Sequence, residues 1–237
     1  NLNTKNYNFF IKLLNKNFKS GNLRIKDSNV FFRHSDSEVL FINKIFKMKY
    51  YHEPKDLKNI VYSENEMFNM PFSIKTFFGE DNNKIFSQFN FNLLKLRIEN
   101  ELKFENEKKI GKSQFTLNKL KRIGEYRIEK NSFNFRLFDK IEQPNVTYKG
   151  NFNFKPFFGN VEGNLDEINL NHLFGSNAVI AQLLKTEIFN NKNIDFKINI
   201  HADKVYKNAN FKNINLSSNL QEGLIDTDNT KFKWRDF

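Results

Sequence analysis

The sequence contains no cysteine, which excludes disulfide bonds and thiol-based catalytic or metal sites and leaves the redox environment of the protein open. It has no apolar run near the roughly 18 residues that a membrane-spanning helix needs. It also has no signal peptide. Because the chain begins at Asn1 without a methionine, we expect a fragment of a longer protein, in which such segments precede residue 1.

Positive charge is in excess, since 38 Lys and Arg against 27 Asp and Glu give a net charge of +11. Such a charge raises nucleic acid or an anionic membrane surface as a partner. However, Lys, Asn, Ile and Phe all have A/T-rich codons, and Ala, Gly and Pro are scarce, which indicates that codon bias explains most of the charge. Codon bias does not explain why so many of the 29 Phe residues recur at every second position.

Alternation of apolar and polar residues is the main structural signal. Residues 194–200 place Ile, Phe, Ile and Ile between Asp, Lys and Asn, and residues 211–220 alternate in the same way. Successive side chains of a strand point to opposite faces, so each segment has one apolar and one polar face. Such strands, joined by tight turns, predict a mainly β fold: an elongated, curved antiparallel sheet in the form of an open groove.

Two helices are predicted beside the strands. Residues 1–20 form a helical lead-in with apolar residues at helical spacing, and a helix capped by Ser176 covers residues 176–189. Residues 22–144 form a first set of strands and residues 145–237 a second set with the second helix, within a single β region over 1–237. Residues 54–69 are more polar and are interpreted as a connection with a short strand over residues 59–62. A change of apolar parity between Leu93 and Leu94 predicts a turn or bulge.

No pattern of catalytic or metal-binding residues accompanies these strands. The four histidines lie far apart and have no partner at metal-ligand spacing, and the sequence has no glycine-framed serine nucleophile. A nucleic-acid platform combines aromatic and basic side chains on one face, whereas here they alternate between faces. We therefore expect no enzyme, no cofactor or metal, and no nucleic-acid partner.

The apolar face of such a sheet must be hidden from water. Two helices are too few to cover about a dozen strands, so the face either packs into a filled core or lines a trough that shields acyl chains. The side chains predicted to line the trough, as solvating and not reacting groups, are Leu94, Leu96, Ile98, Leu102, Phe104, Phe133, Phe135, Phe152, Phe154, Ile194, Phe196, Ile198 and Ile200.

Several segments resemble the AsmA-like family of Gram-negative envelope proteins, of the TamB and YhdP type. Residues 23–45 combine a short strand, a strand that ends in a charged turn, and a strand with the apolar spacing of the family unit. The similarity is closer after Asn145 and extends over about residues 23–234, without any invariant functional residue. The segments that carry it there are 150–154, 165–174, 195–203, 210–216 and 222–225.

The resemblance implies a non-enzymatic lipid-binding groove that transports phospholipid between the inner and outer membranes or supports outer-membrane assembly. It also implies a periplasmic protein that is anchored to the inner membrane through a segment outside this chain, with phospholipid acyl chains as ligands. The alternative is a structural or interaction domain of a larger envelope or surface protein, with a filled core and with protein partners at its sheet edges.

Overall fold

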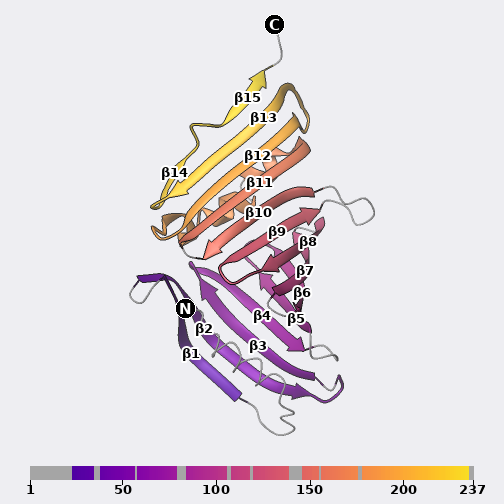
Figure 1. Ribbon diagram of the computed structural model, residues 1–237, viewed down its shortest axis with the longest axis vertical. Helices are drawn as coiled ribbons and strands as arrows, with labels where there is room; N and C mark the ends of the chain where they lie inside the picture. The colour runs from indigo at the N-terminus through magenta and orange to yellow at the C-terminus, as the bar shows by residue number, and fades with distance from the viewer. Residues whose placement is uncertain are drawn as a thin grey trace. The chain divides into compact units, whose positions relative to one another are not determined.

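The computed structural model describes residues 23–34, 38–56, 58–78, 84–105, 108–117, 120–138, 146–154, 156–175 and 178–234 (Figure 1). These residues form fifteen strands and three short helices, which confirms the prediction of a mainly β fold. The predicted lead-in helix over 1–20 lies outside the described residues. The chain divides into two compact units, Asn1–Lys121 and Arg122–Phe237, and the predicted division between residues 144 and 145 falls inside the second unit.

Unit 1 contains seven strands in the order of the chain, and the described register pairs each strand antiparallel with the next. The strands are β1 (Leu23–His34), β2 (Glu38–Glu53), β3 (Lys58–Met67), β4 (Met70–Phe78), β5 (Lys84–Phe91), β6 (Leu96–Glu105) and β7 (Lys108–Leu117).

The short strand predicted at 59–62 is confirmed as part of β3, but β3 extends over Lys58–Met67, which corrects the interpretation of the rest of that segment as a polar connection. The segment is a strand of ten residues, and it continues into β4 through a two-residue turn at Phe68 and Asn69. Both turn residues have positive φ, 54° and 57°, as a type I′ turn requires. The polar composition was misleading because Ser63 and Asn65 occupy buried positions of the strand, where apolar residues were expected.

The turn predicted between Leu93 and Leu94 is confirmed. Residues 92–95 form it, and the Lys95 amide donates to the Asn92 carbonyl at 3.1 Å. The resulting hairpin places Phe91 opposite Leu96. The change of parity in the sequence therefore keeps the apolar residues of β5 and β6 on one face.

Unit 2 begins within β8 (Leu120–Ile128), and its strands again follow the order of the chain, except that β15 pairs with β13. The other strands are β9 (Ser132–Phe138), β10 (Val146–Phe154), β11 (Phe157–Ile168), β12 (Asp195–Val205), β13 (Asn208–Gln221), β14 (Leu224–Asp226) and β15 (Lys231–Trp234).

One strand pair departs from the predicted antiparallel arrangement. Strands β11 and β12 are parallel, with Phe158 opposite Asp195 and Ile168 opposite Val205. A parallel pair needs a crossover connection. Here the crossover consists of α2 (Leu170–Phe174), α3 (Val179–Leu183) and the 3₁₀ helix η1 (Glu187–Asn190), which lie behind the strands in Figure 1.

The described part of the region predicted as one helix over 176–189 is helical, but it is divided into two short segments. Ser176 lies outside the described residues, and α3 ends at Leu183 before η1 begins at Glu187. The side chain of Thr186 explains the break, because its hydroxyl donates to the Leu183 carbonyl at 2.6 Å and accepts from the Ile188 amide at 3.4 Å. A threonine that bonds the backbone in this way competes with the continuous helical ladder.

Register assigns the side chains of each unit to two faces, because residues directly opposite on neighbouring strands point to the same side. In unit 1 we define apolar face 1 by the described side chains Leu23, Ile25, Phe32, Phe41, Ile45, Met48, Tyr50, Val61, Met67, Met70, Phe72, Ile74, Ile85, Phe89, Phe91, Leu96, Ile98, Leu102, Phe104, Phe115 and Leu117. In unit 2 we define apolar face 2 by Tyr126, Ile128, Phe133, Phe135, Leu137, Tyr148, Phe152, Phe154, Phe157, Val161, Leu165, Phe196, Ile198, Ile200, Ala202, Ile214, Leu216, Leu220 and Ile225.

Glycines on apolar face 2 lie directly beneath aromatic rings. A Cβ atom added to Gly159 would lie 2.8 Å from Phe152 Cε1 and closer still to the ring of Phe196. A Cβ at Gly163 would lie 2.8 Å from Tyr148 Cε1. These positions lack a side chain because the neighbouring rings occupy its space, which explains why glycine interrupts the apolar alternation of β11.

We expect Gly159→Ala to destabilise the protein by about 1–3 kcal/mol, because the added methyl group forces the Phe196 ring out of its packed position. Urea unfolding of the purified chain measures the change. The double variant Gly159→Ala with Phe196→Leu should cost less than the two single changes together, since the smaller side chain leaves room. Simple additivity of the two costs would contradict this explanation.

Candidate functional site

Apolar face 1 brings together four of the residues predicted to line a trough. Every second residue of β6 points to apolar face 1, and Asn100 is the one polar residue among them. The four apolar side chains are all half-buried: Leu96, Ile98, Leu102 and Phe104. Ile98, Leu96 and Leu102 have apolar partners on β5 in register, and those partners are Phe89, Phe91 and Ile85. The same face therefore continues from strand to strand across the unit.

Leu94 does not belong to these rows. It lies in the turn at residues 92–95 and is only 8% exposed. Ile194 has a similar position in unit 2, since it precedes β12, is 7% exposed, and donates its amide to the Asn191 carbonyl at 3.3 Å. Both residues lie just before a strand, Leu94 before β6 and Ile194 before β12. The pairing of the strands therefore does not assign either side chain to an apolar face.

A row of short polar side chains crosses apolar face 1 at right angles to the strands. Thr76, Ser87, Asn100 and Ser113 stand opposite one another on β4 to β7. The Thr76 and Ser87 hydroxyls lie 3.1 Å apart, and Ser113 donates to Asn100 Oδ1 at 2.9 Å. This polar row satisfies much of its hydrogen bonding within itself, so covering it with an apolar ligand would leave few orphaned polar groups.

Apolar face 2 carries a cluster of phenylalanine rings. The Phe152 ring centroid lies 6.0 Å from those of Phe133 and Phe135 and 5.6 Å from that of Phe196. These four residues were predicted to line the trough, and contact between aromatic rings at such distances stabilises their arrangement. Register places Phe154, Ile198 and Ile200 on the same face.

Part of apolar face 2 is covered by its own crossover. Leu170 and Leu173 of α2 pack on a cluster that includes Ala202, Ile214 and Ile200. Ala202 is fully inaccessible and Ile214 is 4% exposed. The phenylalanine cluster on β9, β10 and β12 contains no such buried residue, since all four of its rings remain half-buried.

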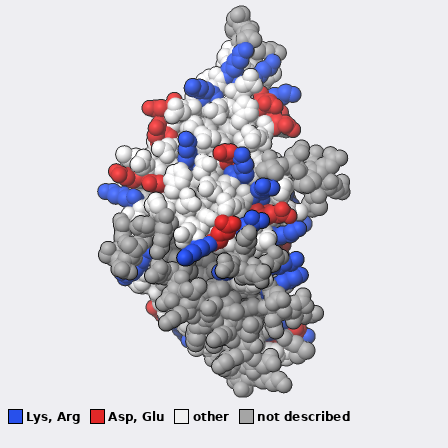
Figure 2. Space-filling model, viewed as in Figure 1, with Lys and Arg blue, Asp and Glu red and all other residues white. Residues whose placement is uncertain are grey.

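The opposite face of unit 2 is polar and charged. Because α2 packs on apolar face 2 and lies behind the strands in Figure 1, the face seen in Figure 2 is the polar one, and Lys, Arg, Asp and Glu are spread among uncharged side chains there. Lys149 Nζ lies 2.9 Å from Glu162 Oε2. This hydrogen bond and charge lower the pKa of the Glu162 carboxyl. The surface is typical of the solvated side of a sheet.

Burial is shallow among the described side chains of both units. Among the described residues, no large side chain is fully buried. The buried clusters are small: one joins Tyr50, Val61 and Ile85 in unit 1, and the other lies beneath α2 in unit 2. A core residue of an ordinary domain packs on all sides at high density, and most side chains of both apolar faces do not.

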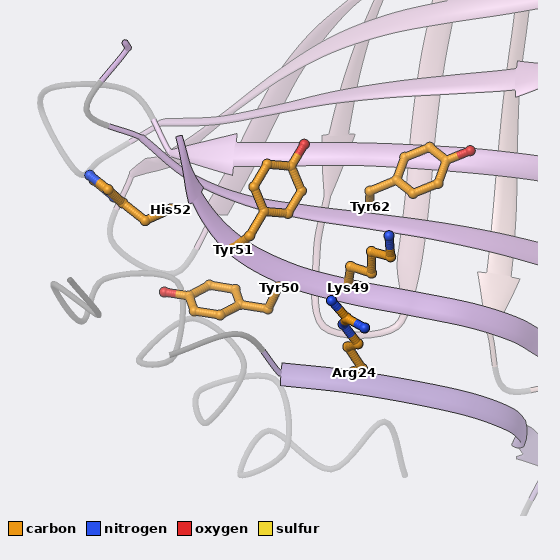
Figure 3. A pocket seen from close by; sticks show the side chains of 6 residues that line it. All are labelled: Arg24, Lys49, Tyr50, Tyr51, His52 and Tyr62. Atoms are coloured by element: carbon orange, nitrogen blue, oxygen red, sulfur yellow. The ribbon is translucent and has the colours of Figure 1, made fainter. Parts of the chain in front are cut away.

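A hollow of about 480 Å³ in unit 1 was not predicted from the sequence (Figure 3). Arg24, Lys49, Tyr50, Tyr51, His52 and Tyr62 line it. Register places Arg24 directly opposite Lys49, and Lys49 directly opposite Tyr62. Burial, followed by the hydrogen bond and charge of Glu64, raises the pKa of the Tyr62 phenol.

A second hollow of about 550 Å³ lies beside the turn between β5 and β6. The residues that line it are Asn90, Phe91, Asn92, Lys95, Leu96, Arg97 and Thr116.

In the described part of the chain, no group of three or more His, Asp or Glu is placed to hold a metal ion. None of the helices among residues 23–234 that the structure describes is long and apolar enough to cross a membrane.

Comparison of the chain with protein-family models, curated proteins and solved structures finds no match. The resemblance to the AsmA-like family therefore stays a prediction.

Sequence reasoning missed the polar row and the hollow for the same reason. Neither is visible within one strand, because each is assembled from single residues on neighbouring strands. The one local signal was Asn100, which interrupts the apolar parity of β6.

The phenol of Tyr148 offers a test of packing on apolar face 2. Burial raises its pKa above 10.0, and the Arg122 guanidinium offsets part of the rise. The folded state favours the neutral phenol. The stability that Tyr148 contributes in this way is therefore present below the ordinary pKa of the phenol and is lost as the pH rises through the raised pKa of the folded state. As the pH rises from about 9 to about 11, the free energy of unfolding should therefore fall less in Tyr148→Phe than in the parent. Urea unfolding at each pH measures this difference.

Tyr206→Phe is the matched control, because Tyr206 is 46% exposed, and it should follow the parent. Equal losses in Tyr148→Phe and the parent would show that the Tyr148 ring is not buried as described.

Proposed function

We propose that this chain is a lipid-binding segment whose apolar faces hold phospholipid acyl chains. The observation that carries the proposal is the pair of apolar faces, each built from registered rows of half-buried Phe, Ile and Leu side chains, with no large side chain fully buried among the described residues. Contiguous apolar surface that stays partly accessible is typical of binding sites for ligands, membranes or proteins.

The geometry of the faces suits a long, flexible apolar ligand. The rows run from strand to strand at intervals of about 4.8 Å, so equivalent apolar contacts repeat along the sheet. Each methylene that leaves water contributes about 0.8 kcal/mol. Because the contacts repeat, an acyl chain can shift along a row and exchange one set of contacts for a similar one.

The polar row on apolar face 1 is compatible with this role. Its members satisfy one another through the bond of Ser113 to Asn100 and the contact of Thr76 with Ser87. An acyl chain lying across them displaces water from groups that already have protein partners, which reduces the cost of desolvation.

The proposal includes the setting that the AsmA-like resemblance implies. In that setting the protein acts in the periplasm, is anchored to the inner membrane by a segment outside this chain, and transports phospholipid or supports outer-membrane assembly. A structural or interaction domain is the alternative, and the following experiment separates the two.

A photo-crosslinking amino acid at Ile198 should form adducts with phospholipid in cells, because Ile198 lies on apolar face 2 beside the phenylalanine cluster. The same amino acid at Lys197, the preceding residue of β12, is the matched control. Lys197 is exposed and points to the polar face, so it should give few adducts. Mass spectrometry of the purified protein identifies the attached molecule.

Adducts of equal yield at both positions would indicate non-specific contact with membranes and would contradict the proposal. Protein adducts at Ile198 without lipid would favour the structural alternative. Circular dichroism of both variants checks that the strands are intact.

A further inference from the structure

We infer that the hollow lined by Arg24 and Lys49 is a binding site for a phosphate group. Such a site recognises a polar group in unit 1 and is separate from the apolar faces that bind acyl chains in the proposed function.

The two cations form a like-charge pair across neighbouring strands. Arg24 on β1 stands directly opposite Lys49 on β2, and like charges in this position destabilise a sheet. Lys49 is half-buried, so its charge is less well solvated than that of a fully exposed lysine. In the part of the chain that the structure describes, no carboxylate lies within ion-pair distance of either side chain.

The two other like-charge pairs in the described register of unit 1 are each balanced by an acid. Lys84 and Lys103 are directly opposite each other, and Glu101 Oε1 lies 3.2 Å from Lys84 Nζ and 3.9 Å from Lys103 Nζ. Lys26 stands opposite Lys47, and Glu64 Oε1 lies 3.9 Å from Lys47 Nζ. The pair at Arg24 and Lys49 differs because its neighbour on β3 is Tyr62, a neutral residue.

Four of the six lining side chains lie on the same side of the strands (Figure 3). Figure 3 shows the side chains of Arg24, Lys49, Tyr51 and Tyr62 on one side of the strands, while Tyr50 and His52 point away from them. The Tyr62 hydroxyl donates to Glu64 Oε1 at 3.1 Å, so it is already engaged. The guanidinium of Arg24, the ammonium of Lys49 and the hydroxyl of Tyr51 are then the donors for the ligand.

These donors match the chemistry of phosphate. A guanidinium presents two parallel N–H groups to two phosphate oxygens, and an ammonium adds a point charge. A bound phosphate also removes the repulsion between the two cations. The hollow of about 480 Å³ has room for a phosphate with an attached organic group. Two sources share this chemistry: the headgroup of a phospholipid, which rests on the proposed function, and a soluble phosphate compound, which does not.

Titration of the full chain with inorganic phosphate tests the site. The parent should bind phosphate and unfold at a higher temperature in its presence, because a ligand that binds only the folded state stabilises it. Arg24→Gln with Lys49→Gln should weaken phosphate binding by about tenfold or more, since the loss of even one charge-assisted hydrogen bond weakens binding by about that factor. Without phosphate the double variant should be at least as stable as the parent, because the repulsion is gone.

A charge-matched control is Lys197→Gln with Lys204→Gln, which removes two exposed cations from unit 2 and should bind phosphate within about twofold of the parent. Absence of phosphate binding by the parent, or an equal loss in both double variants, overturns the inference.

Vesicles of phosphatidylcholine, with and without phosphatidic acid, distinguish the two sources. If Arg24→Gln with Lys49→Gln binds the vesicles that contain phosphatidic acid more weakly than the parent does, the ligand is a phospholipid headgroup. Equal vesicle binding, together with lost binding of inorganic phosphate, indicates a soluble compound. Lipid adducts at Ile198 report separately on the acyl-chain proposal.

Discussion

Cross-strand register is the constraint on which the rest of this structure depends. A strand sends alternate side chains to opposite faces, but only pairing with its neighbours decides which residues become adjacent. In unit 1 the hairpin turn at residues 92–95 sets the pairing of Phe89 with Ile98, and this single register aligns the apolar residues of both strands. A shift by one residue would expose every apolar side chain of β6 on the charged side. The apolar faces, the polar row and the hollow beside Arg24 and Lys49 all depend on such cross-strand pairing, each in its own set of strands.

The parts of the fold that depend on local alternation could be predicted from the sequence. The strands at Phe133, Phe152 and Phe196, their shared face, and the turn after Leu93 follow from period 2 and from a change in its phase. The strand predicted at 59–62 was too short, because Ser63 and Asn65 of β3 occupy buried positions and bond each other at 2.8 Å. The break at Thr186 was missed because it depends on hydroxyl contacts with the Leu183 carbonyl and the Ile188 amide. The parallel pairing of β11 and β12 has no signal within either strand.

The two apolar faces differ in how they are built. Face 1 has aliphatic and aromatic residues on both sides of a polar row, whereas face 2 has rings that lie over glycines and a section sealed by α2. Ring contacts and close backbone approach fix the position of the phenylalanines on face 2. The hydrogen bonds of Asn100 and Ser87 instead hold neighbouring strands of face 1 in register. Both arrangements hold apolar side chains in place through contacts within the sheet itself.

The crossover between β11 and β12 has a consequence for how unit 2 assembles. Hairpins such as β12–β13 join segments that are close in the chain, whereas Phe158 must find Asp195 across the whole helical crossover. Bringing distant segments together has an entropic cost and slows folding. Until that step is complete, β12 presents a bare edge with unpaired amides and carbonyls, which is the kind of edge that recruits strands from other molecules. Unit 2 is therefore most vulnerable to aggregation late in folding, when most of its hairpins have already formed.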